Sequence, residues 1–158
     1  MNKVCFCGIS GNGMSPLAQI LSLKGYKVYG SDRSFDAGRD AFNRKALEDM
    51  GITIVPQDGS AITPDMEVYI SAALDQQNPD VKAALQLNIP VKKRSDLLAK
   101  VFSEYEYGIA VGGTSGKTTT TAMIGYILDI LGYKPCMING GMLRNYECQR
   151  NWHGQNGR

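Results

Sequence analysis

The sequence predicts an α/β protein built on a mostly parallel sheet with helices on both faces, followed by the start of a second α/β unit. Over residues 3–104, short apolar runs alternate with segments of helical periodicity, which is typical of parallel strands covered by helices. The alternation restarts after Glu104, where the loop "GGTSG" separates an apolar run from an amphipathic helix. The two units therefore share one architecture.

Five strands and four helices are expected in the first series. Parallel strands buried on both faces should read as nearly continuous apolar runs, and these segments do. Glycines close two of the helices, Pro79 suits a first helical turn, and Ser95 is the expected cap of the last helix. The expected strands are 3–7, 26–32, 52–55, 67–73 and 89–91. The expected helices are 14–25, 38–51, 79–88 and 95–104.

The second series predicts a strand, a loop, a long helix with a broad apolar stripe and another strand. These elements are expected at 107–111, 112–116, 117–132 and 134–138. We place the boundary at 103–107, which gives a Rossmann-like domain over 1–103 and the start of a second domain over 104–158. From Asn139 the sequence is polar and aperiodic, and we expect a chain that stops partway through its second domain. We assign no role to Tyr146, Trp152 or His153.

Composition limits the function classes. The 158 residues are 43% hydrophobic and 20% charged with a net charge of +2, which fits a globular protein and favours neither nucleic acid nor a membrane as a partner. No apolar run approaches the roughly 20 residues of a membrane span, and the N-terminus lacks a signal peptide pattern. We therefore expect a cytoplasmic protein. The sequence says nothing about its oligomeric state.

Four cysteines are present, and none belongs to a CxxC pair. Cys5 and Cys7 alternate within an apolar run, so we expect both on one face of a strand. The spacing of these two with Cys136 and Cys148 disfavours a zinc site. Buried thiols in a reducing compartment are the favoured interpretation.

The loop "GGTSGKTT" predicts a triphosphate site. Backbone N–H groups at a helix start attract phosphate, and Gly113 and Gly116 would let that backbone approach closely. Lys117 would reach the outer phosphates, and the Thr118 hydroxyl is placed to coordinate Mg²⁺. The full Walker pattern is not met, because Val111 stands where its first glycine would be. An ordinary glycine-rich turn is the alternative.

The loop "GISGNGMS" at 8–15 predicts a second, diphosphate-type site, since it follows a strand and opens a helix. The strict G-x-G-x-x-G pattern fails in both frames, so NAD is a poor candidate ligand. Asp32 ends the next strand, where an acid that binds a ribose hydroxyl is expected. A structural turn without a ligand is the alternative.

A phosphoryl-transfer site also needs a metal-binding carboxylate, usually at the end of another strand. After Lys117 the acidic residues are Asp129, inside the long helix, and Glu147, in the polar tail. Neither lies at a strand end. The predicted triphosphate site therefore lacks the carboxylate that would bind its metal ion.

Taken together, these motifs resemble the Mur ligase family, the ATP-dependent ligases that build the peptide stem of bacterial peptidoglycan. The resemblance covers residues 3 to about 141. It rests on "GISGNGMSP", "GSD" at 30–32, "SAALDQQNPD" at 71–80, "RSDLL" at 94–98 and "GTSGKTTT" at 113–120. Ser10, Pro16 and Ser115 depart from the family pattern.

The resemblance implies that the first domain binds UDP-N-acetylmuramate and the second binds ATP with Mg²⁺. An acyl phosphate would form, and an amine would then displace phosphate. The implied sugar-nucleotide contacts are Gly8, Gly11, Gly13, Met14, Ser15 and Asp32, with Ser71 and Arg94 as weaker candidates. The implied ATP contacts are Gly113, Thr114, Ser115, Gly116, Lys117, Thr118 and Thr119, with Lys117 catalytic and Thr118 on the metal.

The most similar branch of the family joins L-alanine to UDP-N-acetylmuramate, and we expect the 158 residues alone to be inactive. A ligase that attaches murein tripeptide is the nearest alternative, and folate or cyanophycin ligases are more distant ones. A non-catalytic nucleotide-binding module is a rival of another class. A P-loop kinase or GTPase is disfavoured, since it would leave the first 100 residues without a role.

Overall fold

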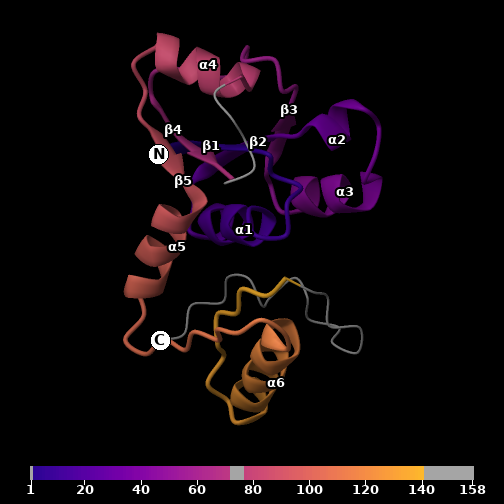
Figure 1. Ribbon diagram of the computed structural model, residues 1–158, viewed down its shortest axis with the longest axis vertical. Helices are drawn as coiled ribbons and strands as arrows, with labels where there is room; N and C mark the ends of the chain where they lie inside the picture. The colour runs from indigo at the N-terminus through magenta and orange to yellow at the C-terminus, as the bar shows by residue number, and fades with distance from the viewer. Residues whose placement is uncertain (1, 72–76, 141–158) are drawn as a thin grey trace.

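The computed structural model of the chain describes residues 2–71 and 77–140. Its centre is a five-stranded, all-parallel sheet, which confirms the predicted parallel architecture, and its strand order is β3-β2-β1-β4-β5 (Figure 1). The strands are β1 (Lys3–Cys7), β2 (Lys27–Ser31), β3 (Thr53–Val55), β4 (Met66–Ile70) and β5 (Val91–Lys93). The order reverses between β1 and β4, and in sheets of this kind ligands bind outside the carboxyl ends of the strands at such a point.

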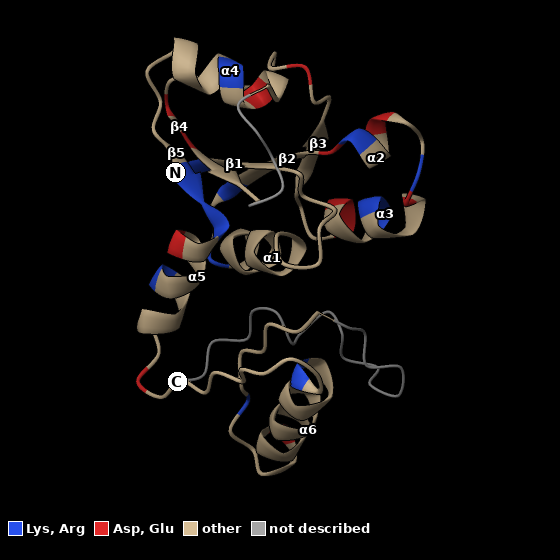
Figure 2. Cartoon of the chain, viewed as in Figure 1, with Lys and Arg blue, Asp and Glu red and all other residues tan. Residues whose placement is uncertain are grey.

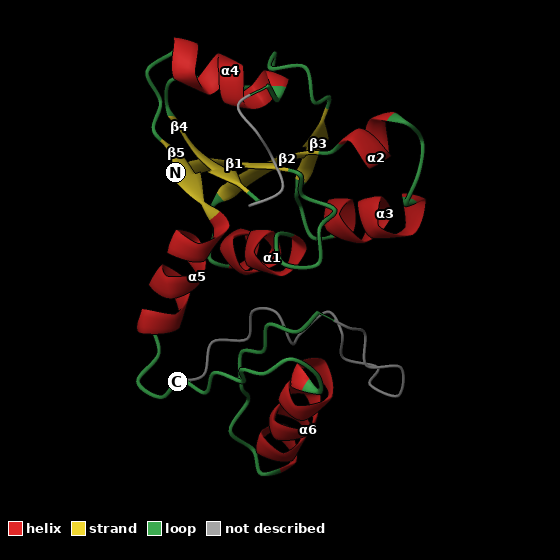
Figure 3. Cartoon of the chain, viewed as in Figure 1, coloured by secondary structure: helices red, strands yellow, loops and turns green. Residues whose placement is uncertain are grey.

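Helices cover both faces of the sheet (Figure 3). On one side lie α1 (Ser15–Leu23), α2 (Arg33–Asp36), α3 (Ala41–Asp49) and α5 (Arg94–Ser103), and on the other lies α4 (Pro79–Gln86). The long helix α6 (Lys117–Ile130) stands apart from the sheet, beyond α1. None of the helices in the described part of the chain is long and apolar enough to cross a membrane.

The strand residues divide between two buried clusters, as their alternation requires. Val4 and Phe6 of β1 face the cluster that contains Leu17 of α1 and Leu97 of α5. Cys5 and Cys7 face the smaller cluster on the other side, with Ala84 of α4. The prediction that both cysteines share one face is confirmed. Among the described residues, no group of His, Cys, Asp and Glu is arranged to hold a metal ion.

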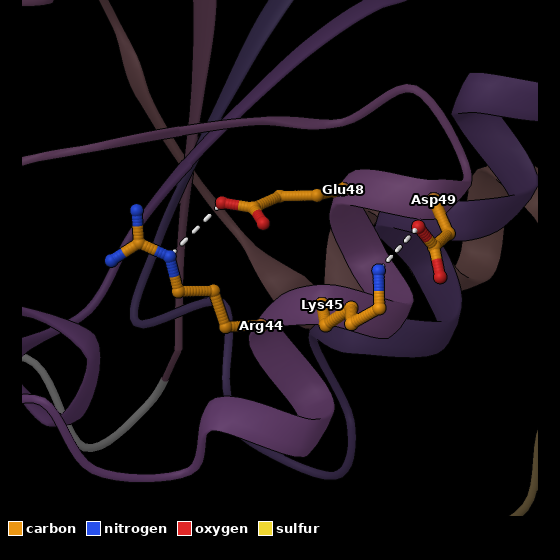
Figure 4. A network of polar contacts seen from close by, with 4 residues as sticks. All are labelled: Arg44, Lys45, Glu48 and Asp49. Carbon is orange, nitrogen blue, oxygen red and sulfur yellow. Dashed lines mark hydrogen bonds and ion pairs between the residues drawn. The ribbon is translucent and has the colours of Figure 1, made fainter.

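Helix α3 has a polar outer surface that carries two ion pairs with i,i+4 spacing (Figure 4). Arg44 Nε lies 3.0 Å from Glu48 Oε1, and Lys45 Nζ lies 3.3 Å from Asp49 Oδ1. Each pair stabilises an exposed helix by only about 0.3–0.5 kcal/mol. Together they add only a small stabilisation to this helix, which has one buried side chain, Leu47.

The structure corrects several expected elements. Helix α2 was missed, and α5 begins at Arg94 with Lys93 as its N-cap, so Ser95 is not the cap. The last strand lies at Val91–Lys93 instead of 89–91. The end of the expected strand at 67–73 falls partly outside the described residues. Segments 107–111 and 134–138 form no strand in the described chain, because no neighbouring strand pairs with them there.

Candidate functional site

The glycine-rich loop lies at the carboxyl end of β1, beside the point where the strand order reverses. Gly8 adopts a left-handed conformation with φ of 76°. The backbone N–H groups of Gly8 and Ile9 donate to the carbonyl of Ser31, at 2.8 and 3.0 Å. The loop is therefore fixed to the end of β2 before it enters α1.

The structure explains the residue type at each position of the "GSD" segment, 30–32. A side chain at Gly30 would place its Cβ 2.2 Å from Cδ1 and 3.0 Å from Cβ of Ile9, so glycine lets Ile9 pack closely on β2. Ser31 is fully buried, and its hydroxyl donates to Asp80. Asp32 caps α2 by accepting the backbone N–H of Ser34 at 2.8 Å.

Asp32 also holds the glycine-rich loop. Its Oδ2 accepts the backbone N–H of Ser10 at 3.0 Å and the Ser10 hydroxyl at 2.7 Å. Burial would raise the pKa of this carboxyl, but the hydrogen bonds from Ser10 and Ser34 outweigh that effect and hold it below the ordinary value. Ser10, which departs from the family pattern, therefore has a structural role.

The structure brings Arg94 to the loop. A Cβ on Gly13 would lie 3.0 Å from Nη1 of Arg94 and 3.1 Å from its Cδ, so the half-buried guanidinium group lies directly against Gly13. Arg94 follows β5 at the start of α5, within the basic stretch 92–94 (Figure 2). Of the weaker candidates, Arg94 is thus placed with the loop, while Ser71 lies half-buried just beyond the end of β4.

Met14 and Ser15 occupy less accessible positions than the other predicted contacts. The Met14 side chain is 1% exposed and belongs to the core. The backbone N–H groups of both residues donate to the carbonyl of Gly11, at 2.8 and 3.0 Å. Pro16 is in the first turn of α1, where its missing N–H costs no hydrogen bond. Gly11 itself is exposed, and a Cβ there would meet only the Gly8 carbonyl oxygen at 3.5 Å and Met14 Cγ at 4.0 Å.

A buried polar network that sequence reasoning missed lies beside this loop. Asp80 accepts the Gly59 N–H at 2.8 Å as well as the Ser31 hydroxyl, and the Gln57 amide donates to Ser31 at 3.4 Å. Burial raises the pKa of the Asp80 carboxyl. Within the described chain, Gln57 Oε1 and Asn78 Nδ2 are buried and lack hydrogen-bond partners. The motif "NPD" at 78–80 could have pointed to Asn78 and Asp80 as members of this network. No sequence pattern points to Gln57.

The second loop, at 112–116, is open. Gly113 has φ of 145° and Gly116 has φ of 75°, so both need glycine, and a Cβ on Gly112 or Gly116 would meet nothing within 4 Å. Gly116 is also the N-cap of α6. Residues 112–120, which include the predicted contacts Thr114, Ser115 and Thr119, are all exposed. The backbone at this helix start is thus accessible to a ligand.

Lys117 folds back over its own loop. Its Nζ donates to the carbonyls of Gly113, at 2.5 Å, and Thr114, at 3.1 Å. Both acceptors belong to the glycine-rich loop that precedes α6. The chain returns to the loop at Gly140, where a Cβ would lie 3.8 Å from the Thr118 hydroxyl. Asp129 lies within α6, and Glu147 lies outside the described residues.

Comparisons with known proteins bear on both loops. The profile of the Mur ligase family, catalytic domain, matches residues 3–106. A UDP-N-acetylmuramate–L-alanine ligase from Rickettsia bellii is 40% identical over 146 residues, which are 92% of this chain and 29% of the relative. The chain thus spans less than a third of the length of that protein.

Two solved structures have the same fold. The UDP-N-acetylmuramate–alanine ligase of Thermotoga maritima is 30% identical with a TM-score of 0.85, over 98% of this chain and 35% of that one. The UDP-N-acetylmuramate:L-alanyl-γ-D-glutamyl-meso-diaminopimelate ligase of Neisseria meningitides is 26% identical with a TM-score of 0.82, over 92% and 45% of the two chains.

Proposed function

Because the chain belongs to the Mur ligase family, we propose that it is the N-terminal part of an ATP-dependent ligase that joins L-alanine to UDP-N-acetylmuramate. The observation that carries the proposal is the pairing, in one chain, of the family's sheet domain with an open loop that starts a helix in "GKTT". The 40% identity to an L-alanine ligase supports the choice of amino acid. Two domains, 1–103 and 104–158, would divide the two substrates between them.

The first domain would bind UDP-N-acetylmuramate at the carboxyl ends of its strands. The exposed backbone of Gly11 and the half-buried Arg94 beside Gly13 suit a diphosphate, since one offers close backbone approach and the other a bidentate cation. Asp32 would orient the loop on the uridine side through Ser10. Gly8 and Ser71 complete this edge, and Met14 and Ser15, whose N–H groups donate to the Gly11 carbonyl, would shape the loop around the ligand.

The second domain would bind ATP at residues 113–119. The open helix start fits a triphosphate, because unpaired N–H groups and the Lys117 cation would face its oxygens. The exposed Thr118 hydroxyl would hold Mg²⁺. Bound there, the metal would neutralise charge on the transferred phosphate. Its carboxylate ligand would come from elsewhere in the longer protein.

The reaction would proceed in two steps. A substrate carboxylate oxygen attacks the γ-phosphorus, so an acyl phosphate forms and ADP leaves. The amine of L-alanine then attacks the acyl carbon, and inorganic phosphate leaves from a tetrahedral intermediate as the amide forms. Two anions must meet in the first step, and Lys117 together with the helix start would offset their repulsion.

A second candidate is the attachment of a peptide in place of L-alanine. The likeness to the Neisseria ligase, with a TM-score of 0.82, supports this alternative, though less than the likeness to L-alanine ligases supports the first. Both candidates share the sugar nucleotide and ATP, so they differ only in the acceptor.

Calorimetric titration tests the first site. We expect the 158-residue chain to bind UDP-N-acetylmuramate weakly, UDP more weakly still, and NAD not at all, with no ligase activity. Preferential binding of NAD would reject the ligase proposal in favour of a dehydrogenase-like site.

Substitution of Lys117 tests the second site in the longer protein. Lys117→Ala should abolish turnover and leave the affinity for UDP-N-acetylmuramate nearly unchanged, because the two loops serve different substrates. Lys82→Ala, at an exposed lysine on α4, is the matched control and should retain activity. Equal loss of turnover and sugar-nucleotide affinity in Lys117→Ala would contradict the two-site scheme.

A further inference from the structure

The end of α1 remote from the glycine-rich loop carries a cluster of contacts with no role in either predicted site. Lys24 is the C-cap of α1 and forms an ion pair with Glu104, the C-cap of α5. The Lys24 ammonium also lies 5.7 Å from the ring centroid of Tyr105. These contacts join residues about 80 positions apart in the sequence, at the point where the chain leaves the sheet domain.

The chain that returns from α6 packs onto the same place. Cys136 and Ile138 contact the larger core cluster together with Tyr105, and Met137 between them is only 7% exposed. The Tyr105 side chain lies beside Cys136, and burial raises the pKa of both groups. The outgoing chain at 105 and the returning chain at 136–138 therefore meet on the sheet domain. We call Lys24, Glu104, Tyr105 and Cys136 the linker cluster.

The path of the outgoing chain is also constrained. A Cβ on Gly108 would lie 2.3 Å from Cζ of Phe102, so the linker backbone presses against the Phe102 ring of α5. Tyr107, between these contacts and two residues from Tyr105, is 84% exposed. Apolar side chains along α6 are exposed as well, Met123 and Ile127 among them. Among the described residues, the linker cluster lies with Met137 and Ile138 where the second unit packs on the first, whereas these side chains of α6 do not.

We propose that the linker cluster fixes the orientation of the nucleotide loop at 112–118 relative to the glycine-rich loop at 8–15. Helix α1 connects the two, since Ser15 starts it at the glycine-rich loop and Lys24 ends it at the cluster. The chemical consequence rests on the proposed function: a carboxylate and a γ-phosphate react only when their atoms come within about 3–3.5 Å, so the units must be held in register. Tyr105 and Lys24 are thus positioning residues.

Distance measurement between the units tests this without any nucleotide. Spin labels on non-natural residues would replace Phe42 on α3 and Met123 on α6, which are 74% and 61% exposed, in the full 158-residue chain. The parent chain should give one narrow distance distribution. Tyr105→Ala should lose the narrow peak, and the exposed neighbour Tyr107→Ala should keep it. A broad distribution in the parent chain, or equal effects of the two substitutions, would overturn the proposal.

Exchanging the charges of Lys24 and Glu104 tests the proposal a second time, by the same distance measurement. Glu104→Lys should broaden the distribution by setting two cations side by side, and Glu106→Lys, at a neighbouring exposed acid, should not. Adding Lys24→Glu to Glu104→Lys restores the opposite charges and should recover the narrow peak. Unchanged far-UV circular dichroism identifies variants that stay folded. A narrow peak in the folded Glu104→Lys variant, or no recovery on exchange, refutes the proposal even where nucleotide binding at both loops is intact.

Discussion

The hydroxyl of Ser10 donates a 2.7 Å hydrogen bond to Oδ2 of Asp32, the oxygen that also accepts the Ser10 backbone N–H. One residue of the glycine-rich loop is thus held twice by the residue that caps α2. The loop has a defined shape before any ligand binds, and a preorganised loop loses less conformational entropy on binding.

We therefore expect Ser10→Ala to lower the free energy of unfolding by about 1 kcal/mol, the usual value of one hydrogen bond. The affinity for UDP-N-acetylmuramate should fall as well, since the loop is less ordered. Urea denaturation and calorimetric titration measure the two effects. Ser60→Ala removes a comparable Ser–Asp contact on the exposed surface and should alter neither. Identical results for the two variants would contradict a role for Ser10 in shaping the loop.

The pH dependence of stability tests the state of Asp32. Its pKa in the folded chain lies below the ordinary 3.8, because the hydrogen bonds from Ser10 and Ser34 outweigh burial. The resulting stabilisation is fully present above the unfolded pKa and is lost as pH falls through the folded one. Asp32→Asn should therefore lose less stability than the parent chain on acidification below 3.8, as followed by urea denaturation. Parallel stability curves for the two chains would argue against the assigned shift.

The contribution of Asp80 to stability should depend on pH in the opposite direction to that of Asp32. Burial raises its pKa above 3.8, so the stabilisation it contributes is complete below that value and is lost as pH rises through the folded pKa. An asparagine retains an acceptor for the Gly59 N–H and a donor toward Ser31. We expect Asp80→Asn to be at least as stable as the parent at neutral pH and less stable in acid. A variant that loses stability equally at every pH would instead indicate a purely steric role.

Gly30→Ala tests the crossing of the loop over β2. The added methyl would lie 2.2 Å from Cδ1 of Ile9, and overpacking of this kind usually costs about 1–3 kcal/mol. Thermal denaturation should show the loss, and Ile9→Ala in the same chain should recover part of it. If Gly30→Ala proved neutral, the tight contact with Ile9 would not describe the protein in solution.

Most of the sheet was predictable because β1 to β4 carry local apolar patterns, whereas β5, with the sequence Val-Lys-Lys, does not and was placed two residues early. Segments 107–111 and 134–138 carry the same pattern, but a strand also needs a neighbour, and the described chain gives them none. Helix α2 was missed because its four residues are too few to show a period; its signal is the cap at Asp32. The sequence motifs "GISGNGMS" and "GGTSGKTT" were enough to locate the two glycine-rich loops. The pairing of Lys24 with Glu104 depends on tertiary packing alone, which no local pattern reveals.

The two open glycines give the sharpest test of two separate phosphate sites. A Cβ on Gly112 would meet nothing within 4 Å, and one on Gly11 would meet only the Gly8 carbonyl oxygen at 3.5 Å and Met14 Cγ at 4.0 Å. Neither Gly11→Ala nor Gly112→Ala should therefore change the melting temperature. Each methyl would, however, stand where a phosphate oxygen must approach the backbone.

Binding in the longer protein should consequently separate the two variants. Gly11→Ala should weaken UDP-N-acetylmuramate and spare ATP, and Gly112→Ala should weaken ATP and spare the sugar nucleotide. Titration of each variant with each ligand gives four values from proteins of equal stability, so misfolding cannot imitate the pattern. If either substitution weakened both ligands alike, or neither weakened any, the two loops would not be independent phosphate sites and the division of substrates between them would fail.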